Sequence, residues 1–134
     1  MSVDEVKKTR TLSPSLKVIK SLIVSKDNFN ELARTVKDFE DHVDLFITDT
    51  FDPDTGATGA TGLPHDWSIS KKIVGMTKVP VILAGGLNPK NVKQAIKTVR
   101  PAGVDAHTGV ENALGEKDPV LVNEFVKEAR ANLL

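Results

Sequence analysis

The chain has 134 residues with 18 basic and 18 acidic side chains, and 40% of its residues are hydrophobic. This balance is ordinary for a globular domain and gives no electrostatic reason to expect nucleic acid or an anionic membrane surface as the main partner. The absence of cysteine excludes disulfides, thiolate metal sites and a cysteine nucleophile in this chain. No apolar run reaches the roughly 20 residues of a membrane span, and the first residues lack the apolar core of a signal peptide, so we expect a cytoplasmic protein.

The N-terminal region is polar and is expected to form a flexible arm over residues 1–15, followed by a single domain over residues 16–134. Residues 16–24 are rich in β-branched side chains, which is typical of a short strand. From Asp27 to Phe39 the apolar residues recur at helical spacing. The domain is therefore predicted to begin with a strand and a helix.

A second strand is predicted over residues 43–50, and it places a carboxylate, Asp49, where the apolar run stops. Residues 51–67 form the longest irregular stretch, with a glycine at every third position from Gly56 to Gly62. Loops longer than about a dozen residues are usually functional or disordered, and the closing tryptophan, Trp67, favours an ordered loop. A second helix is expected to follow.

The third strand, residues 81–84, is a short apolar run typical of a strand buried on both faces. It ends at Gly85 and Gly86, after which Asn88 can cap a helix with Pro89 at its first position. Glycines let the backbone approach a ligand closely, and a helix start directs free N–H groups toward it. The junction therefore suits a phosphate group, although a tight turn without a ligand explains the glycine pair equally well.

A fourth strand is predicted over residues 102–106, and Asp118 with Pro119 begins a final helix that runs to Leu133. Four strands, each followed by a helix, predict an α/β fold with parallel strands and right-handed crossovers. The candidate chemical groups then lie at the C-terminal ends of the strands. A barrel of eight such units takes about 200 to 250 residues, so four units are close to half of one.

Four short motifs, taken in order, resemble phosphoribosylanthranilate isomerase. They are a strand ending at Asp49, a Gly-Ala-Thr-Gly loop before Asp66-Trp67, a Leu-Ala-Gly-Gly-Leu segment at residues 83–87, and a Thr-Gly-Val-Glu segment at residues 108–111. Each motif is weak alone, but their order and spacing match over residues 43–118. The first strand also looks like the family's fifth, so the resemblance covers about residues 16–134 and implies strands five to eight of a TIM barrel.

The resemblance implies an isomerase of tryptophan biosynthesis that carries out an Amadori rearrangement of N-(5-phosphoribosyl)anthranilate without a cofactor. In that mechanism a general acid opens the ribose ring, and a general base removes the C2 proton. By position Asp49 would be the general acid, a role that needs a partly buried site in which a carboxylic acid keeps its proton near neutral pH. The alternative for Asp49 is a carboxylate that caps a turn or accepts a loop amide.

The resemblance also implies a binding site for a phosphorylated sugar. Its phosphate would be held by backbone N–H groups of Gly85, Gly86, Thr108 and Gly109. The loop that would close over the anthranilate side consists of Gly59, Ala60, Thr61 and Gly62.

Several residues depart from the family's pattern. The family's general base is a cysteine after its first strand, and this chain contains neither that strand nor a cysteine. Ala60 stands in place of a glycine, and His107 with Thr108 in place of the usual Ser-Ser. We interpret Asp105 as structural and favour a loop hydrogen bond over catalysis for His65 and His107. No metal-ligand cluster is expected around these histidines.

Four parallel strands without closure leave two bare edges and an uncovered face, both prone to pair with another chain. We therefore expect either a homo-oligomer or a partner that supplies the complementary N-terminal half-barrel. Three hypotheses for function stay open at this point. The chain is the C-terminal half of an isomerase that becomes active once completed, a non-catalytic phosphosugar-binding relative, or a half-barrel fragment whose only property is assembly.

Overall fold

The computed structural model describes residues 1–50 and 67–133 and contains a four-stranded sheet in the order β1-β2-β3-β4. The strands are β1 (Ile19–Val24), β2 (Leu45–Thr50), β3 (Val81–Leu83) and β4 (Gly103–Val104). Every neighbouring pair is parallel. The predicted α/β fold with four parallel strands is therefore confirmed, although β4 is shorter than the predicted strand over residues 102–106.

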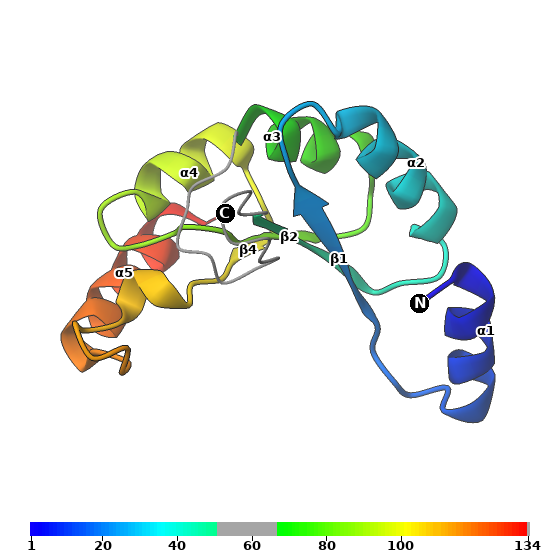
Figure 1. The fold of residues 1–134 in the computed structure, drawn as a ribbon, viewed down its shortest axis with the longest axis horizontal. Helices are drawn as coiled ribbons and strands as arrows, with labels where there is room; N and C mark the ends of the chain where they lie inside the picture. The colour runs from blue at the N-terminus through cyan, green and yellow to red at the C-terminus, as the bar shows by residue number, and fades with distance from the viewer. Residues whose placement is uncertain (51–66, 134) are drawn as a thin grey trace.

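A helix follows each strand: α2 (Phe29–Phe39), α3 (Trp67–Met76), α4 (Val92–Val99) and α5 (Pro119–Asn132). Figure 1 shows α2, α3 and α4 side by side along one face of the sheet, with α5 packed next to α4. The last of these starts as expected, because the Asp118 side chain accepts from the N–H groups of Val120 and Leu121 and Pro119 occupies the first turn. Among the described helices, none is long and apolar enough to cross a membrane.

Burial alternates along the central strands, as expected where one sheet face is covered. On β2, Phe46, Thr48 and Thr50 are buried, whereas the residues between them are only partly buried. The covered side chains join two apolar clusters between sheet and helices, one around Phe46 and Ile73 and the other around Leu83 and the α4–α5 pair. Burial of these side chains provides the main stabilisation of the fold.

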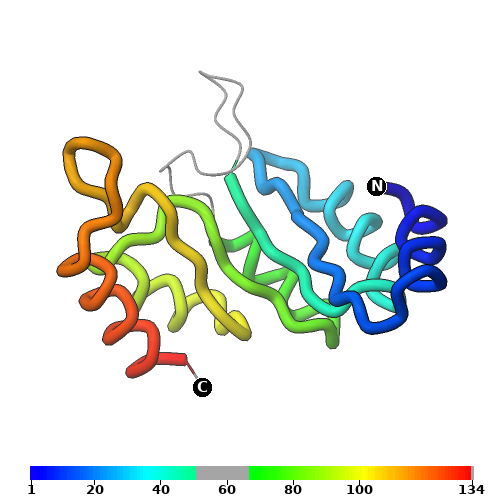
Figure 2. The backbone as a smooth tube through the Cα atoms, turned by 90° about the horizontal axis from the view of Figure 1, so that it is seen from below, coloured from blue at the N-terminus to red at the C-terminus, as the bar shows by residue number. Residues whose placement is uncertain are grey.

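The opposite face of the sheet carries the remaining strand residues. Its apolar members are Ile19, Ile23, Leu45, Ile47 and Ile82, which the strand register places together. Figure 2, seen from below, shows the strands in front of the helices, so none of the described helices covers this face. Ile19 is 52% exposed as a result. We call this surface the open face.

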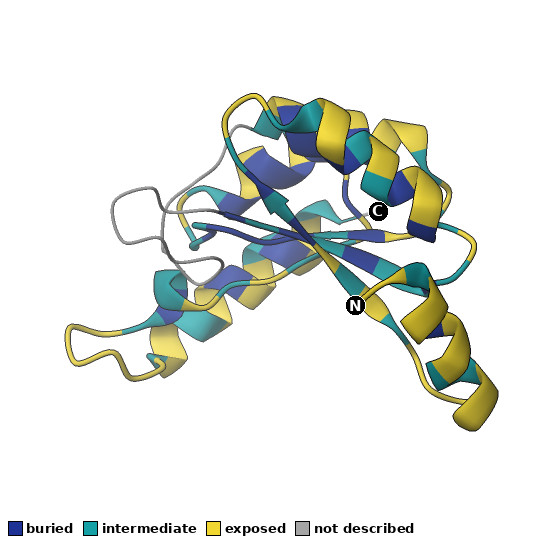
Figure 3. Cartoon of the chain, turned by 45° about the vertical axis from the view of Figure 1, so that its right-hand side comes forward, coloured by how far each residue is buried: buried dark blue, intermediate teal, exposed yellow. Residues whose placement is uncertain are grey.

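Residues 1–15 differ from the expected flexible arm, because Val3–Leu12 form helix α1. The Glu5 N–H donates to Ser2 Oγ at 3.2 Å, and the Ser2 N–H donates to Glu5 Oε2 at 2.6 Å. This capping box is visible in the sequence as Ser-x-x-Glu. Most of α1 is exposed (Figure 3), but Val6 is 1% exposed and belongs to the core. The prediction of an unstructured arm was therefore wrong.

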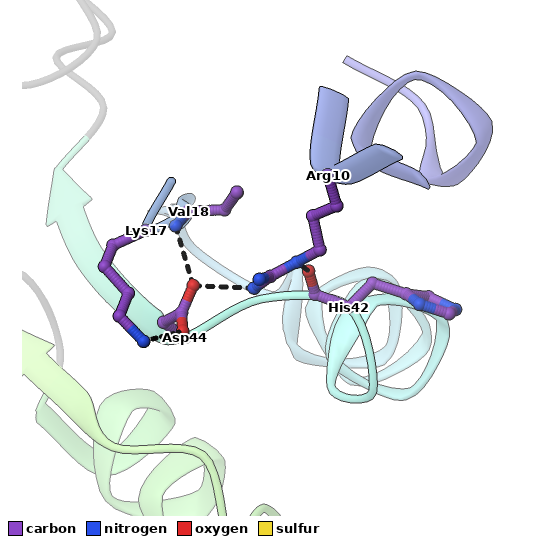
Figure 4. Close-up of polar contacts among 5 residues, drawn as sticks. All are labelled: Arg10, Lys17, Val18, His42 and Asp44. Atoms are coloured by element: carbon purple, nitrogen blue, oxygen red, sulfur yellow. Dashed lines mark hydrogen bonds and ion pairs between the residues drawn. The ribbon is translucent and has the colours of Figure 1, made fainter. Parts of the chain in front are cut away.

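Asp44 ties α1 to the start of β2 (Figure 4). Its Oδ2 accepts from Arg10 Nη2 at 2.6 Å and from the Val18 N–H at 2.8 Å, and its Oδ1 accepts from Lys17 Nζ at 3.1 Å. Arg10 also donates from Nε to the His42 carbonyl at 2.9 Å. Chiefly the Val18 N–H, and then Lys17 and Arg10, lower the pKa of Asp44 from 3.8 to about 2. We call these contacts the Asp44 hub.

Candidate functional site

A pocket of about 180 Å³ lies where β2, β3 and β4 end. The residues that line it include Asp49, Gly85, Gly86, Asp105, His107 and Thr108. They come from three segments of the sequence and meet because parallel strands present their C-terminal ends at the same edge of a sheet. This edge is where ligands of such folds bind.

Asp49 is the last residue but one of β2 and enters the pocket from the open face. Strand alternation puts it on the same side as Ile47, while Thr48 and Thr50 point into the core. One carboxylate oxygen, Oδ1, accepts the Thr50 N–H at 2.8 Å. Asp49 is half-buried, so its carboxyl group is held against its own strand and remains accessible from the pocket.

The turn after β3 requires its two glycines. Gly85 has φ 98° and Gly86 has φ 65°, in the left-handed region that other residues adopt only at a cost. The side chain of Asn91 fixes the turn, since its Nδ2 donates to the Gly86 carbonyl at 2.9 Å and its Oδ1 accepts the Asn88 N–H at 2.9 Å. The backbone at Gly85 and Gly86 is therefore held open toward the pocket by the protein itself.

The helix after this turn begins later than predicted. Asn88 Oδ1 accepts from the N–H groups of Lys90 at 2.9 Å and Asn91 at 3.2 Å, as a cap does, but α4 begins at Val92. Pro89 thus lies in a turn that leads into the helix rather than in the first helical turn.

Gly109 plays a different part from the other predicted phosphate residues. A Cβ atom at this position would lie 1.9 Å from the Leu87 carbonyl oxygen, so only glycine fits. Gly109 therefore lets the segment after β4 pack against the segment after β3. Its neighbour Thr108 lines the pocket.

A polar cluster supports the His107 side of the pocket. Glu111 Oε1 lies 3.2 Å from His107 Nδ1 and accepts a short hydrogen bond from Lys117 Nζ. Lys117 also donates to the His107 carbonyl at 3.0 Å. The Lys117 hydrogen bond is the largest cause that lowers the pKa of Glu111; burial opposes it, and the charges of Lys117 and His107 add to it.

The pocket brings Asp49, Gly85, Gly86 and Thr108 together. The predicted substrate loop, residues 59–62, lies outside the described residues. Sequence reasoning missed that Asp105 and His107 also line the pocket, although both follow β4 and so stand at the same sheet edge as Asp49. Within residues 1–50 and 67–133, no three His, Asp or Glu side chains are grouped as a metal site.

Comparison with known proteins gives consistent relatives. The family model described as N-(5'phosphoribosyl)anthranilate (PRA) isomerase matches residues 3–128. N-(5'-phosphoribosyl)anthranilate isomerase 2 of Methanosarcina mazei is 45% identical over 129 residues, which are 96% of this chain and 56% of that protein. The structure of the isomerase from Pyrococcus furiosus matches with a TM-score of 0.72 and 32% identity, covering 97% of this chain and 58% of that one.

One further matching structure contains a ligand. It is phosphoribosyl anthranilate isomerase in complex with reduced 1-(o-carboxyphenylamino)-1-deoxyribulose 5-phosphate, with a TM-score of 0.68 and 28% identity over 94% of this chain and 55% of that one. The present chain thus spans little more than half the length of the relatives it matches. The family model covers nearly all of its residues, and on that ground the chain belongs to the N-(5'-phosphoribosyl)anthranilate isomerase family.

Proposed function

We propose that this chain forms the C-terminal half of an active site that rearranges N-(5'-phosphoribosyl)anthranilate in tryptophan biosynthesis. The observation that carries the proposal is the pocket at the strand ends, which joins the Asp49 carboxylate to the Gly85-Gly86 turn. The relative bound to a reduced product-like 5-phosphate supports the substrate class.

In the proposed mechanism Asp49 is the general acid. It donates a proton to the ribose ring oxygen as the C1–O bond breaks, and the electron pair of the anthranilate nitrogen forms the C1–N double bond. A general base then removes the C2 proton, and the resulting enol becomes the ketone of the deoxyribulose product. The hydrogen bond from Thr50 to Oδ1 orients the carboxyl group for the first step.

The substrate phosphate is assigned to backbone N–H groups of Gly85, Gly86, Thr108 and Gly109. The left-handed backbone of the two adjacent glycines supports this assignment, because a side chain there would block close approach of the ligand. Residues 59–62 are assigned to the anthranilate side of the site by family resemblance.

The general base is assigned to a partner that covers the open face. That partner is either a complementary N-terminal half-barrel, which would complete the site, or a second copy of this chain. Support comes from the apolar side chains of the open face and from the lengths of the relatives, of which this chain matches 56% in the first case described.

A second candidate function is a phosphosugar-binding relative without catalysis. It is favoured by the lack of any cysteine in the chain, since the family resemblance implies a cysteine base. This reading keeps the phosphate site and gives Asp49 no proton to transfer.

The test follows the fluorescence of the anthranilate substrate, with this chain alone and mixed with a cysteine-containing N-terminal half of a related barrel. We expect turnover in the mixture and a loss of about 100-fold or more for Asp49→Asn, which keeps the shape of the side chain but cannot act as a carboxylic acid. Asp38→Asn, on an exposed position of α2, is the matched control and should leave turnover unchanged.

The outcomes separate the candidates. Turnover that does not depend on Asp49 would contradict its role as general acid. If no combination turns over while phosphosugar binding persists, the non-catalytic relative is the correct reading.

A further inference from the structure

His107 lines the same pocket as Asp49 and the glycine turn, at a position where the family commonly has a serine. We propose that His107, when protonated, binds the phosphate or another anionic group of the ligand, and that Glu111 holds the imidazole in place for this purpose. The inference rests on the proposed phosphate site and adds to it a residue that makes ligand affinity depend on pH.

The anchoring of the ring is the first argument. Its Nδ1 lies 3.2 Å from Glu111 Oε1, and Glu111 is held in turn by Lys117. The Glu111 side chain is only 16% exposed, whereas that of His107 is 60% exposed. The imidazole is thus fixed at its inner end and accessible at its outer end. With Glu111 as the partner of Nδ1 among the described residues, Nε2 is left to meet a ligand.

The size of the pocket is the second argument. Thr108 follows His107 directly in the chain, and Gly85 and Gly86 line the same space of about 180 Å³. A phosphate group held at the glycine turn therefore lies close to the imidazole. Positioning residues need this kind of short reach, because a charge-assisted hydrogen bond forms only within about 3 Å.

The charges around the pocket are the third argument. Asp49 and Asp105 line it, and both repel an anionic ligand when ionised. Lys117 is engaged by Glu111, so its charge is largely compensated there. Among the described residues that line the pocket, His107 is the side chain that can become a cation. Its protonation would reverse part of the unfavourable charge that Asp49 and Asp105 create.

The test measures the affinity for inorganic sulfate, which resembles a phosphate dianion but does not change its own charge over the pH range used. Calorimetric titrations of the full chain are compared at about pH 5.5 and about pH 8, on either side of the ordinary histidine range. We expect sulfate to bind about three- to tenfold more tightly at the lower pH, a value that allows for the exposure of the imidazole.

The variants are His107→Gln and, as the matched control, His42→Gln, whose histidine lies near the opposite edge of the sheet before β2. We expect His107→Gln to bind sulfate nearly equally at both pH values, with an affinity close to that of the wild type at pH 8. His42→Gln should keep the full pH dependence. Glu111→Gln should move the midpoint to lower pH, because the neutral amide no longer stabilises the imidazolium charge.

Each result has a distinct meaning. If His107→Gln keeps the wild-type pH dependence, the inference is wrong and the phosphate site at the glycine turn stands. If the wild type binds no sulfate at either pH, both the phosphate site and the role of His107 are overturned. Sulfate binding with no isomerase turnover would leave this inference standing and count against the proposed catalysis alone.

Discussion

Gly109 is a residue whose role depends on a single close contact. It holds the segment after β4 against the Leu87 carbonyl, and both segments form the pocket. We expect Gly109→Ala to lower the free energy of unfolding by about 2 kcal/mol or more, because the added Cβ must push the Leu87 backbone away. Thermal unfolding followed by circular dichroism measures the effect.

Gly75→Ala is the matched control for this substitution. Gly75 lies in α3, and a Cβ built there meets nothing within 4 Å. Alanine favours a helix by up to about 1 kcal/mol over glycine, so this variant should be as stable as the wild type or more stable. Equal stability of the two variants would show that Gly109 does not make the contact described here.

Some features of the site could be predicted at the level of single residues and others could not. Asp49, Gly85 and Gly86 follow apolar runs in the sequence, so strand ends and a turn can be placed without coordinates. The contact between Gly109 and Leu87 joins residues far apart in the chain and depends on how two loops pack. No local pattern contains that information.

Helix α1 and its attachment show the same limit at the scale of elements. The apolar spacing of α2 predicted it well, whereas α1 buries mainly Val6 and so carries a weak pattern. The capping box at Ser2 was the signal available in the sequence. The Asp44 hub could not be predicted, because Arg10 and Asp44 meet only once α1 has docked beside the sheet.

Asp44 gives α1 a pH-dependent attachment. Its pKa in the folded state, about 2, lies below the ordinary value of 3.8, so the unfolded chain binds this proton more readily. The carboxylate therefore stabilises the fold above about pH 4, and this contribution is lost as the pH falls toward 2. We expect Asp44→Asn to lower the free energy of unfolding near neutral pH and to have a much smaller effect near pH 2.

Urea unfolding of both proteins across this pH range measures the difference. Asp41→Asn is the control, because Asp41 is an exposed carboxylate three residues away. A constant difference between wild type and Asp44→Asn at all pH values would contradict the ionic origin of the attachment. Loss of stability by Asp41→Asn would point to net charge rather than to the hub.

The shape of the whole molecule leaves one side of its sheet without a protein layer. Strand order, handedness and helix placement followed from the alternation of periods in the sequence, since parallel strands with short connections allow few arrangements. What lies against the open face is encoded outside these elements. For that reason the sequence predicts that the face needs a partner but leaves two partners open.

Light scattering tests the self-association that we propose as one of these possibilities. We expect the purified chain at micromolar concentration to be larger than a monomer, and Ile47→Lys to reduce its mass, because a charge at the centre of the open face is costly to bury. Asn30→Lys, at an exposed position of α2, should not change the mass. A stable monomeric wild type would exclude self-association and leave the complementary half-barrel as the partner.

The two ends of β2 carry different responsibilities, and this separation bears on how the protein can change. The Asp44 hub lies just before the strand and the Asp49 pocket at its far end, about 16 Å away for five strand residues. Substitutions that far apart usually contribute independently to stability. Selection or engineering can thus strengthen the lower end of the sheet without disturbing the pocket, and mutations that reshape the pocket for a new ligand can be compensated from the opposite edge.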